Sequence, residues 1–534
     1  MRAMRSIERS VSVSARPAPL EESGRHPGRA TGTTMRYRPI ASHWRALLLA
    51  LLCTAFASAI PAASARLPAP VARAFTDAGI PLDSIAVVVT DTERPGSLLT
   101  HNADRPMNPA SVMKLVTTFA ALELLGPEYR WRTEAYLGGP LTDGTLEGDL
   151  LLKGYGDPKI TIEQWQGFMA TLRAQGLARI TGDLVLDRSQ FRVPAHDPSA
   201  FDGDPLRPYN VGPDALLLNF KAVRFLFVPD AAAGTAVVRM EPPLPQVTAL
   251  PEPRLASRDC NDWRATVGAS FVDLGDSATA RFSGTYPALC GERDWYVALL
   301  DPPTYALGMF TTYFREAGGT FGGGVRSGSA PAGAAPFARL ESPPLAEIVR
   351  DVNKLSNNVM ARQLFLTLAM VDRPPPATIA NAEATIREWL SRRNLKLPGL
   401  VLDNGAGLSR RERVTASGLA RLLAAADESA VRDTFENSLA IAAIDGTLER
   451  RFQGSSVSGQ ALLKTGTLEG VKALAGYVRG SGGRRYIVVA IVNHPAAAQA
   501  QPALDFLVGW VHHDAGADRN ARKPGAGFRS ATAR

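Results

Sequence analysis

The order of helical and strand-like segments along the chain is the feature that most limits its possible folds. Predicted strands at Ile85–Thr90 and Leu98–His101 form a hairpin that leads into an apolar helix beginning near Asn108. From about residue 134 to residue 324 the chain changes to short strand-like runs that end in Gly- and Pro-rich turns, with one predicted helix among them. Several helices and two strong strands return after residue 340. Because the hairpin and the first helix cannot bury their apolar faces alone, we expect the later segments to pack against them.

One domain interrupted by a large insertion follows from this arrangement. A chain of 534 residues also exceeds what a single core usually accommodates. We therefore expect an α+β, multidomain fold in which an antiparallel sheet is flanked by helices and carries a large β-rich insert. The expected divisions are an N-terminal extension and signal peptide at 1–65, the two parts of the main domain at 66–133 and 336–513, the β-rich insert at 134–335, and a disordered tail at 514–534.

The N-terminal extension contains a stretch typical of a secretory signal peptide. Arginines flank the apolar run within His43–Ala65, and Ala63–Ala65 fits an A-x-A cleavage site. Met35 would begin a signal peptide of ordinary length. A membrane-spanning anchor is the alternative, but the apolar run is short and ends in Ala, Ser and Pro. We therefore predict an exported, periplasmic protein with no membrane span after removal of the signal.

The formal net charge of +8 does not indicate a nucleic-acid-binding surface. Nine arginines and three acidic residues lie in the first 65 residues, and five basic and two acidic residues lie in residues 514–534. The body of the chain between them is therefore close to a net charge of −1. A body without excess positive charge gives no basic face, so we expect no nucleic-acid partner.

The chain has three cysteines, at positions 53, 260 and 290. Cys53 lies in the predicted signal peptide and would be removed with it. The remaining pair in an exported chain predicts a disulfide between Cys260 and Cys290, with two buried free thiols as the alternative. No CxxC motif or His cluster has metal-ligand spacing, so we expect no metal and no other cofactor.

The helix that begins near Asn108 has an unusually polar start. Asn108 suits the N-cap, Pro109 suits the first turn, and Gly126 suits the C-terminal stop. Ser111 would then lie in the first turn, at the positive end of the helix dipole, with Lys114 one turn later on the same face. A serine hydroxyl needs a base to become a nucleophile, and a partly buried lysine here could serve as that base. The S-x-x-K spacing also occurs by chance in many helices.

Two further motifs make a chance occurrence a weaker explanation of the S-x-x-K spacing. Ser356 and Asn358 lie at a predicted break between two helices, where polar side chains can enter a cleft, although simple helix capping is the alternative. Lys464, Thr465 and Gly466 lie on a predicted edge strand, although an ordinary turn is the alternative. Gly466 would let another backbone approach, and Lys464 would supply a fixed positive charge. The ordered set S-x-x-K, S-D-N and K-T-G is the signature of penicillin-binding proteins and class A β-lactamases. The middle motif here departs from S-D-N only at Asn357, the variable position of the broader S-x-N form.

The sequence as a whole resembles the D-alanyl-D-alanine carboxypeptidases of the class C, low-molecular-mass penicillin-binding proteins, peptidase family S13. The resemblance spans about residues 70–512. Ser356 follows Ser111 after 245 residues, an interval far longer than in class A β-lactamases and in keeping with the large insert of the S13 family. Three further segments carry the resemblance, LLKGYGDP, DNGAGLSR (Asp403–Arg410) and IDGTLERR (Ile444–Arg451). In the second of these, Asn404 and Ala406 depart from the family pattern, so a direct catalytic role there is not expected.

The resemblance implies a role for each residue of the first two motifs. Ser111 would attack the carbonyl between two D-alanines and form an acyl-enzyme, with Lys114 as the base. Ser356 would relay a proton to the leaving amine, and Asn358 would orient Lys114 and the substrate amide. A Ser-His-Asp triad is the competing mechanism, but no G-x-S-x-G elbow surrounds Ser111 and His494 is expected to be structural.

The third motif would bind the substrate. The resemblance implies that Lys464 and Thr465 bind its terminal carboxylate, while the strand that contains Gly466 forms the edge along which the peptide lies. The backbone N–H groups of Ser111 and Thr467 would form the oxyanion hole. Side chains of the insert are expected to be solvated turn residues (Asp157, Asp202, Asp204) or packing residues (Trp131, Tyr155, Tyr209), with contact to the peptide stem as the alternative.

The expected function is therefore a serine-type D-Ala-D-Ala carboxypeptidase acting on peptidoglycan stem peptides, with DD-endopeptidase cleavage of cross-links as an activity it could also carry. The expected partners are peptidoglycan peptides and, as inhibitors that bind covalently, β-lactam antibiotics. A β-lactamase and a catalytically silent penicillin-binding scaffold are the two alternatives. A β-lactamase needs a deacylating base that the sequence does not mark, and the intact motifs argue against a silent scaffold.

Overall fold

The computed structural model describes residues 67–93, 96–250 and 252–513 of the chain. The predicted signal peptide with its cleavage site and the predicted tail at 514–534 lie outside the described residues. Within those ranges, no helix combines the length and the apolar character that crossing a bilayer requires.

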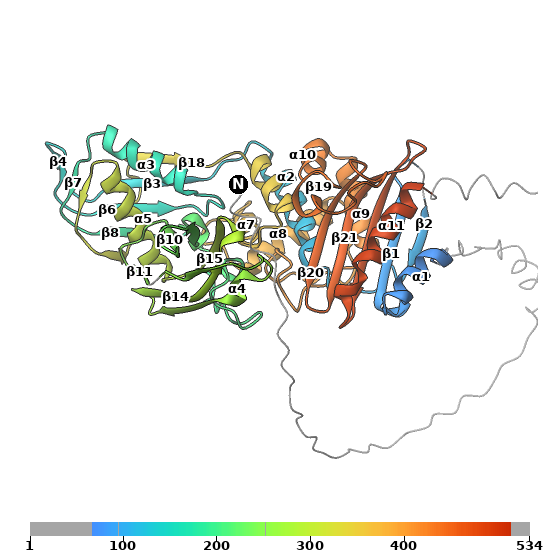
Figure 1. Ribbon diagram of the computed structural model, residues 1–534. Coiled ribbons are helices and arrows are strands. Elements are labelled where there is room, and N and C mark those ends of the chain that lie inside the picture. The colour runs from blue at the N-terminus through green and yellow to red at the C-terminus, as the bar shows by residue number, and fades with distance from the viewer. Residues whose placement is uncertain (1–66, 94–95, 251, 514–534) are drawn as a thin grey trace, which may run out of the picture. The chain divides into compact units, whose positions relative to one another are not determined.

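A six-stranded antiparallel sheet joins two distant parts of the chain (Figure 1). Its strand order is β19-β20-β21-β22-β1-β2, so the N-terminal strand β1 lies beside the C-terminal strand β22, with Val88 opposite Val489. The expected fold class, an antiparallel sheet flanked by helices with a β-rich insert, is confirmed. The strands are β1 (Ile85–Asp91), β2 (Ser97–His101), β19 (Ala440–Ile441), β20 (Ala461–Leu468), β21 (Val471–Arg479) and β22 (Arg485–Asn493).

Side chains of this sheet alternate between two cores, as the period of two along a strand requires. In β1, Val87 and Val89 face one core, whereas Ala86 and Val88 face the other. Burial on both faces explains why β1 and β22 are almost continuously apolar. The first core is covered by α1 (Ala69–Asp77) and α11 (Gln501–His513), and the second by α2 (Lys114–Leu125), α6 (Leu345–Lys354), α7 (Asn358–Leu368), α8 (Ile379–Arg392), α9 (Ala416–Asp427) and α10 (Arg432–Asn437).

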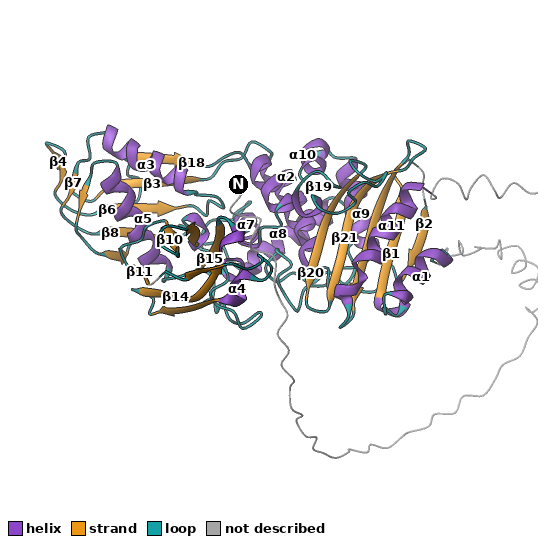
Figure 2. Cartoon of the chain, viewed as in Figure 1, coloured by secondary structure: helices purple, strands orange, loops and turns teal. Residues whose placement is uncertain are grey.

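Within the described residues, the chain between α2 and α6 forms three further sheets (Figure 2). They pack around a separate apolar core. The five-stranded sheet extends from Arg132 to Glu341, slightly beyond the insert predicted at 134–335. The predicted bounds of the insert stay a prediction. This sheet has the order β17-β8-β6-β3-β18, and it consists of β3 (Arg132–Leu137), β6 (Leu150–Gly154), β8 (Leu184–Asp187), β17 (Val325–Ser327) and β18 (Ala338–Glu341).

Two further sheets complete the described part of the insert. A short four-stranded sheet has the order β16-β7-β5-β4, and in the larger sheet β13 pairs with β14 beside the path β11-β14-β12-β10-β9-β15. Their strands are β4 (Leu141–Thr142), β5 (Thr145–Leu146), β7 (Arg179–Ile180), β9 (Val223–Asp230), β10 (Thr235–Glu241), β11 (Val247–Leu250), β12 (Arg254–Ala256), β13 (Val267–Asp273), β14 (Ala278–Pro287), β15 (Arg293–Val297) and β16 (Thr320–Phe321).

The insert contains two helices that the sequence did not predict. Besides the predicted helix α3 (Ile162–Ala174), the insert contains α4 (Trp263–Thr266) and the fifteen-residue α5 (Pro302–Glu316). The proline pair at the start of α5 resembles a turn, but proline is tolerated in the first helical turn. Asp301 caps this helix by accepting a hydrogen bond from the N–H of Thr304 at 2.7 Å.

Polar contacts join the insert to helix α6. Lys159 of the insert pairs with Asp351 at 2.6 Å and with Glu347 at 3.0 Å, and both acids lie on α6. The Lys159 and Asp351 side chains are only 11% and 8% exposed, so solvent screens this pair less than a surface ion pair.

Helix α7 also contacts the insert, through two neighbouring residues. Gln363 donates to the carbonyl of Asp214 at 2.7 Å and accepts from the N–H of Asp214 at 3.0 Å. The Arg362 guanidinium donates to the carbonyl of Val211 at 2.8 Å, and burial lowers the pKa of Arg362 to about 10. One turn of α7 is therefore fixed against backbone groups of the insert.

Asp157 is not the solvated turn residue that the sequence suggested. Its side chain is 1% exposed, and its Oδ1 accepts the N–H of Lys159 at 2.8 Å. Its Oδ2 has no hydrogen-bond partner among the described residues. Burial raises the pKa of Asp157 to about 6, although the Lys159 N–H and the positive charge of Lys159 partly oppose this shift.

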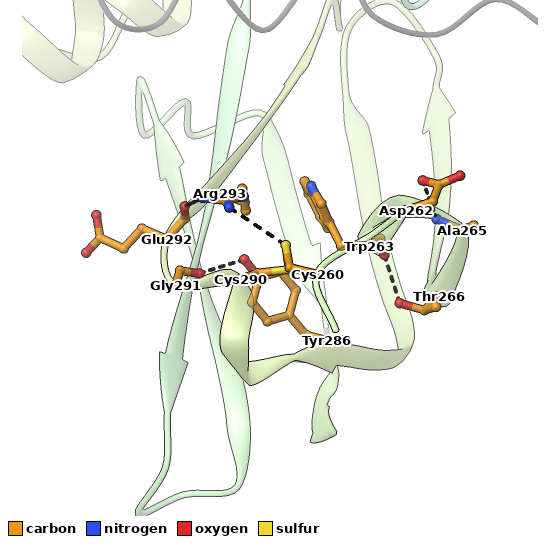
Figure 3. The surroundings of a disulfide bond; sticks show 10 residues. All are labelled: Cys260, Asp262, Trp263, Ala265, Thr266, Tyr286, Cys290, Gly291, Glu292 and Arg293. Carbon is orange, nitrogen blue, oxygen red and sulfur yellow. Dashed lines mark hydrogen bonds between the residues drawn. A yellow bond between two sulfur atoms is a disulfide. The ribbon is translucent and has the colours of Figure 1, made fainter. Parts of the chain in front are cut away.

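The predicted disulfide between Cys260 and Cys290 is present (Figure 3). It connects residues 30 positions apart within the insert, and Cys290 is buried. Beside it, the Tyr286 hydroxyl donates to the carbonyl of Gly291 at 2.8 Å. The disulfide therefore belongs to the core of the insert rather than to the six-stranded sheet.

Asp157→Asn should stabilise the protein increasingly as the pH rises from 4 to 7. The pKa of the folded wild type, about 6, exceeds the value of about 3.9 for an unfolded aspartate, so the wild type loses stability as the pH rises through this window. The difference in unfolding free energy between variant and wild type should grow by up to about 3 kcal/mol across it. Urea titrations at pH 4.5 and pH 7.5 measure the difference, with the exposed Asp143→Asn as control. A difference that is the same at both pH values would contradict the assignment.

Replacing both Cys260 and Cys290 by serine should lower the unfolding free energy by roughly 3–4 kcal/mol, because a 30-residue loop is no longer closed in the unfolded chain. Urea titration of the oxidised wild type and the double variant measures this loss. Dithiothreitol should shift the midpoint of the wild type toward that of the variant and leave the variant unchanged. Free thiols at both positions in protein purified from an oxidising compartment would rule out the bond.

Candidate active site

Ser111 lies in a 3₁₀ turn, η3 (Ala110–Met113), that continues directly into α2. The predicted N-cap at Asn108 is wrong in detail, because Ala110 has a φ of 47° and interrupts the helical path before Ser111. Instead, the Asn108 Oδ1 accepts the N–H of Ala110 at 2.9 Å and closes a local turn. Lys114 is therefore the first residue of α2, and Ser111 precedes it on the same turn.

The segment before Ser111 is fixed to the end of strand β22. The N–H of Asn108 donates to the Oδ1 of Asn493 at 2.8 Å, and the Asn493 amide donates back to the carbonyl of Asn108 at 2.9 Å. The Asn108 amide in turn donates to the carbonyl of Ser409 at 2.8 Å. Sequence reasoning missed Asn493, whose only signal was a polar residue at the end of a buried strand.

Lys114 is fully buried and contacts oxygens from separate segments. Its Nζ lies 2.9 Å from the Oγ of Ser111 and 2.6 Å from the Oδ1 of Asn358, and it also donates to the carbonyl of Ala406. An unprotonated amine has two N–H bonds and one lone pair. With those two bonds directed to Asn358 and Ala406, the lone pair can accept the Ser111 proton.

The contact with Ala406 is a role that the sequence did not predict. The residue contributes its backbone carbonyl, so its departure from the family pattern at the side chain does not affect the interaction with Lys114. The neighbouring carbonyl of Gly405 accepts the hydroxyl of Thr117 on α2 at 2.7 Å. Two consecutive carbonyls of this loop therefore face α2.

The buried Glu412 side chain binds the backbone of the loop that contains Gly405 and Ala406. Its carboxylate is fully buried and accepts the backbone N–H groups of Asp403, Asn404 and Gly405 at 3.2, 3.1 and 3.0 Å. Burial raises the pKa of Glu412, while these three donors act in the opposite direction. Together with the Asn404 side chain, which accepts the N–H of Ala406 at 2.9 Å, Glu412 thus fixes the loop that presents its carbonyl to Lys114.

Ser356 and Asn358 lie at the junction between α6 and α7, and the predicted helix break is confirmed. Ser356 adopts a φ of 56° and is buried. The predicted capping role falls to Asn357, whose side chain accepts the N–H of Met360 at 2.9 Å. Capping by this residue leaves Ser356 and Asn358 to contact the two lysines of the site.

Lys464 is also fully buried and lies on strand β20, as predicted. Its Nζ donates to the Oγ of Ser356 at 2.9 Å and to the carbonyl of Thr465 at 2.9 Å. The prediction of an edge strand needs correction, because β19 pairs with β20 at Leu462 and Leu463. Beyond that pairing, residues 464–468 have β21 as their one strand partner within the described residues.

Gly466 permits a close backbone approach to Ser111, as predicted. A Cβ atom added at Gly466 would lie 2.6 Å from the carbonyl oxygen of Pro109 and 3.1 Å from the amide nitrogen of Ser111. On another side, a Cβ added at Gly407 would lie only 2.0 Å from the carbonyl oxygen of Ala110. Glycines at both positions therefore allow two segments to enclose the backbone that precedes Ser111.

The rest of the third motif lies further from the core. Thr465 is half-buried, and its hydroxyl lies 2.8 Å from the hydroxyl of Thr447. Thr467 is exposed. The sequence marked Thr447 only as part of a family-like segment and gave it no role. Its signal was a threonine in a Gly-containing turn shortly before the strand that bears Lys464.

A loop of the insert reaches the border of this site. The Arg410 guanidinium lies 4.8 Å from the ring centre of Phe201, and it pairs with the Glu469 carboxylate at 3.1 Å. Glu469 follows strand β20, two residues after Thr467. Asp202, next to Phe201, is exposed and accepts the hydroxyl of Tyr209 at 2.7 Å.

The remaining candidates make structural contacts. His494 accepts the N–H of Ala496 at 3.2 Å, in keeping with its predicted structural role. Trp131 is buried, and its indole N–H donates to Thr367 at 2.9 Å. The other contacts are Tyr155 to Glu134 at 2.7 Å and Arg207 to Asp204 at 2.6 Å. Across the described ranges, no group of three or more His, Cys, Asp or Glu residues could hold a metal ion.

Comparison with known proteins places this site in a family. A model described as the D-Ala-D-Ala carboxypeptidase 3 (S13) family matches residues 67–512. A D-alanyl-D-alanine carboxypeptidase of Actinomadura sp. (strain R39) is 30% identical over 434 residues, which cover 78% of this chain and 80% of the relative. The D-alanyl-D-alanine carboxypeptidase DacB of Haemophilus influenzae is 25% identical over 397 residues, which cover 74% of this chain and 82% of the relative.

Solved structures share the fold. The crystal structure of penicillin binding protein 4 from Haemophilus influenzae matches with a TM-score of 0.69 at 23% identity, covering 83% of this chain and 99% of that one. A complex of the same protein with a β-lactam matches with a TM-score of 0.66 at 22% identity, with the same coverage. Because the family model spans nearly all the described residues and the Actinomadura relative is matched over most of its length, this chain belongs to the D-Ala-D-Ala carboxypeptidase 3 (S13) family.

Proposed function

We propose that this protein is a serine-type D-Ala-D-Ala carboxypeptidase that acts on peptidoglycan stem peptides and is acylated by penicillins at Ser111. The observation that carries the proposal is the 2.9 Å contact between the Lys114 amine and the Ser111 hydroxyl. Membership of the S13 family supports it, as does the β-lactam complex of the Haemophilus influenzae structure. Export to the periplasm, where the substrate lies, is part of the proposal and rests on the predicted signal peptide.

Acylation begins at Ser111. Its Oγ attacks the carbonyl carbon of the penultimate D-alanine, and unprotonated Lys114 accepts the hydroxyl proton. The Asn358 Oδ1 and the Ala406 carbonyl orient the two remaining N–H bonds of the amine. The bond between the carbonyl carbon and the terminal amine then breaks, and an ester to Ser111 remains.

The leaving amine needs a proton, which Ser356 supplies. Lys464 donates to the Ser356 Oγ at 2.9 Å, so the hydroxyl hydrogen of Ser356 is free to point toward the substrate amine. Transfer of the proton from Lys114 through Ser356 to the amine releases D-alanine. Water then cleaves the ester, which frees the shortened peptide and restores Ser111.

The third motif holds the substrate during these steps. The peptide lies along residues 464–468 of β20, which have β21 as their one strand partner within the described residues. Lys464 and Thr465 bind the terminal carboxylate. The N–H groups of Ser111 and Thr467 stabilise the oxyanion that develops on the carbonyl oxygen.

Two measurements test the function directly. Release of free D-alanine from a purified pentapeptide ending in D-Ala-D-Ala tests carboxypeptidase activity, and products from a cross-linked muropeptide reveal any cleavage of cross-links. Intact-protein mass after addition of benzylpenicillin separates the alternatives. A carboxypeptidase gives a lasting adduct, a β-lactamase gives a transient adduct, and a silent scaffold gives none.

Ser111→Ala should abolish both penicillin labelling and D-alanine release while the protein stays folded. Loss of the nucleophile in serine hydrolases lowers the rate by about 10⁴-fold or more. Mass spectrometry of the labelled protein and a D-alanine assay measure the two effects. The exposed Ser458→Ala serves as control and should behave as wild type. Labelling of Ser111→Ala at wild-type stoichiometry would disprove the role of Ser111.

Lys464→Ala should lower kcat/KM for a D-Ala-D-Ala peptide by roughly tenfold to a hundredfold, because a charged hydrogen bond to the carboxylate contributes about 1.5–3 kcal/mol. The loss should be much smaller for the same peptide with an amidated C-terminus, which lacks the carboxylate in the wild-type complex as well. Steady-state kinetics on both peptides measure the two losses in kcat/KM, with the exposed Lys396→Ala as control. Equal losses on acid and amide would assign Lys464 to proton transfer instead of carboxylate binding.

A further inference from the structure

The contact between Thr447 and Thr465 lies next to the proposed carboxylate site and has no role in the mechanism above. The two hydroxyl oxygens are 2.8 Å apart, and both side chains are half-buried. Thr447 belongs to the short 3₁₀ turn η7 (Gly446–Leu448), which precedes strand β20 by more than ten residues. Its position beside Thr465 is therefore a tertiary contact rather than a consequence of neighbouring sequence.

The turn that bears Thr447 is held against the end of helix α6. Lys354 of α6 forms an ion pair with Asp445, whose other carboxylate oxygen accepts the N–H of Ile441 at 2.9 Å. Gly446 has a φ of 57°, and a Cβ atom added there would lie 2.6 Å from the carbonyl oxygen of Lys354. Lys354 lies two residues before Ser356. The Thr447 hydroxyl is thus fixed relative to Ser356 as well as to Thr465.

Hydrogen-bond counting gives this contact a function. A threonine hydroxyl has one hydrogen to donate and two lone pairs that accept. Thr465 can donate to a substrate carboxylate only if its hydrogen is not committed to Thr447. When the substrate binds, the direction of the hydrogen bond between the two hydroxyls reverses. Thr447 then donates to Thr465, and Thr465 donates to the carboxylate. Such a chain of donors strengthens each bond through polarisation.

We propose that Thr447 is a positioning residue that orients the Thr465 hydroxyl toward the terminal carboxylate of the substrate. The inference rests on the proposed carboxypeptidase function and adds to it a residue that determines selectivity for a free C-terminus. Thr447 acts through Thr465 and does not itself touch the substrate.

The test compares Thr447→Val, which removes the hydroxyl at nearly constant shape, with Thr447→Ser, which keeps it. On a peptide ending in D-Ala-D-Ala, Thr447→Val should lower kcat/KM about threefold to tenfold, mainly through KM, as expected for loss of one hydrogen bond. Thr447→Ser should stay within about twofold of wild type. On the amidated peptide, Thr447→Val should change kcat/KM less than about twofold.

A double-mutant cycle with Thr465→Val separates orientation from direct binding. If Thr447 acts through Thr465, the double variant should match Thr465→Val alone on the acid peptide, because the oriented hydroxyl is already absent. Effects that multiply in full would overturn the inference, as would equal losses on acid and amide. Thr447→Ala, measured alongside and checked by thermal denaturation, takes the place of the valine variant if that variant misfolds.

The proposed function and this inference fail in different ways. Absence of D-alanine release by the wild-type protein would overturn the carboxypeptidase function and the inference with it. Normal release by the wild type, together with a Thr447→Val variant that is as active as wild type on the acid peptide, would overturn the inference alone.

Discussion

The burial of the Lys114 amine among oxygens from distant segments is the constraint on which the rest of the structure depends. A buried amine without hydrogen-bond partners is costly, so every segment that supplies an acceptor must reach α2. Asn358 and Ala406 lie 244 and 292 residues beyond Lys114 along the chain. After the insert, the chain must therefore come back to α2. The pairing of β1 with β22 joins the N-terminal and C-terminal parts of the same domain.

The parts of the site that the sequence predicted are those that depend on local spacing. Ser111 and Lys114 share a face because they are three residues apart, and Lys464 lies on the predicted strand, directly after the apolar run Ala461–Leu463. The parts that it missed depend on tertiary contacts or on the backbone. Every residue except proline offers the same N–H and C=O groups, so the carbonyl of Ala406 gave no signal. Thr447 and Asn493 are ordinary polar residues until folding places a partner beside them.

The same distinction applies to the fold. The apolar periods after residue 340 are long and regular, and the helices and strands predicted there are present. Asp157 gave no sign of its burial, because burial follows from how its turn packs in the folded protein rather than from the turn itself. The proline pair of α5 fits both a turn and a first helical turn, and the cap from Asp301 decides between them. In each case the local sequence was compatible with two structures, and contacts formed in the folded protein selected one of them.

Helix α7 belongs to both halves of the molecule. Its first residue, Asn358, contacts Lys114, and Arg362 and Gln363 one turn later are bonded to backbone groups of the insert. Consecutive turns of an α-helix are joined by backbone hydrogen bonds from each N–H to the carbonyl four residues earlier, so these contacts lie on one continuous element. A non-strand segment of the insert, which contains Val211 and Asp214, therefore holds α7 beside Lys114. A shortened enzyme that lacked the insert would keep Ser111 and Lys114 but would lose the contacts that hold Asn358 beside Lys114.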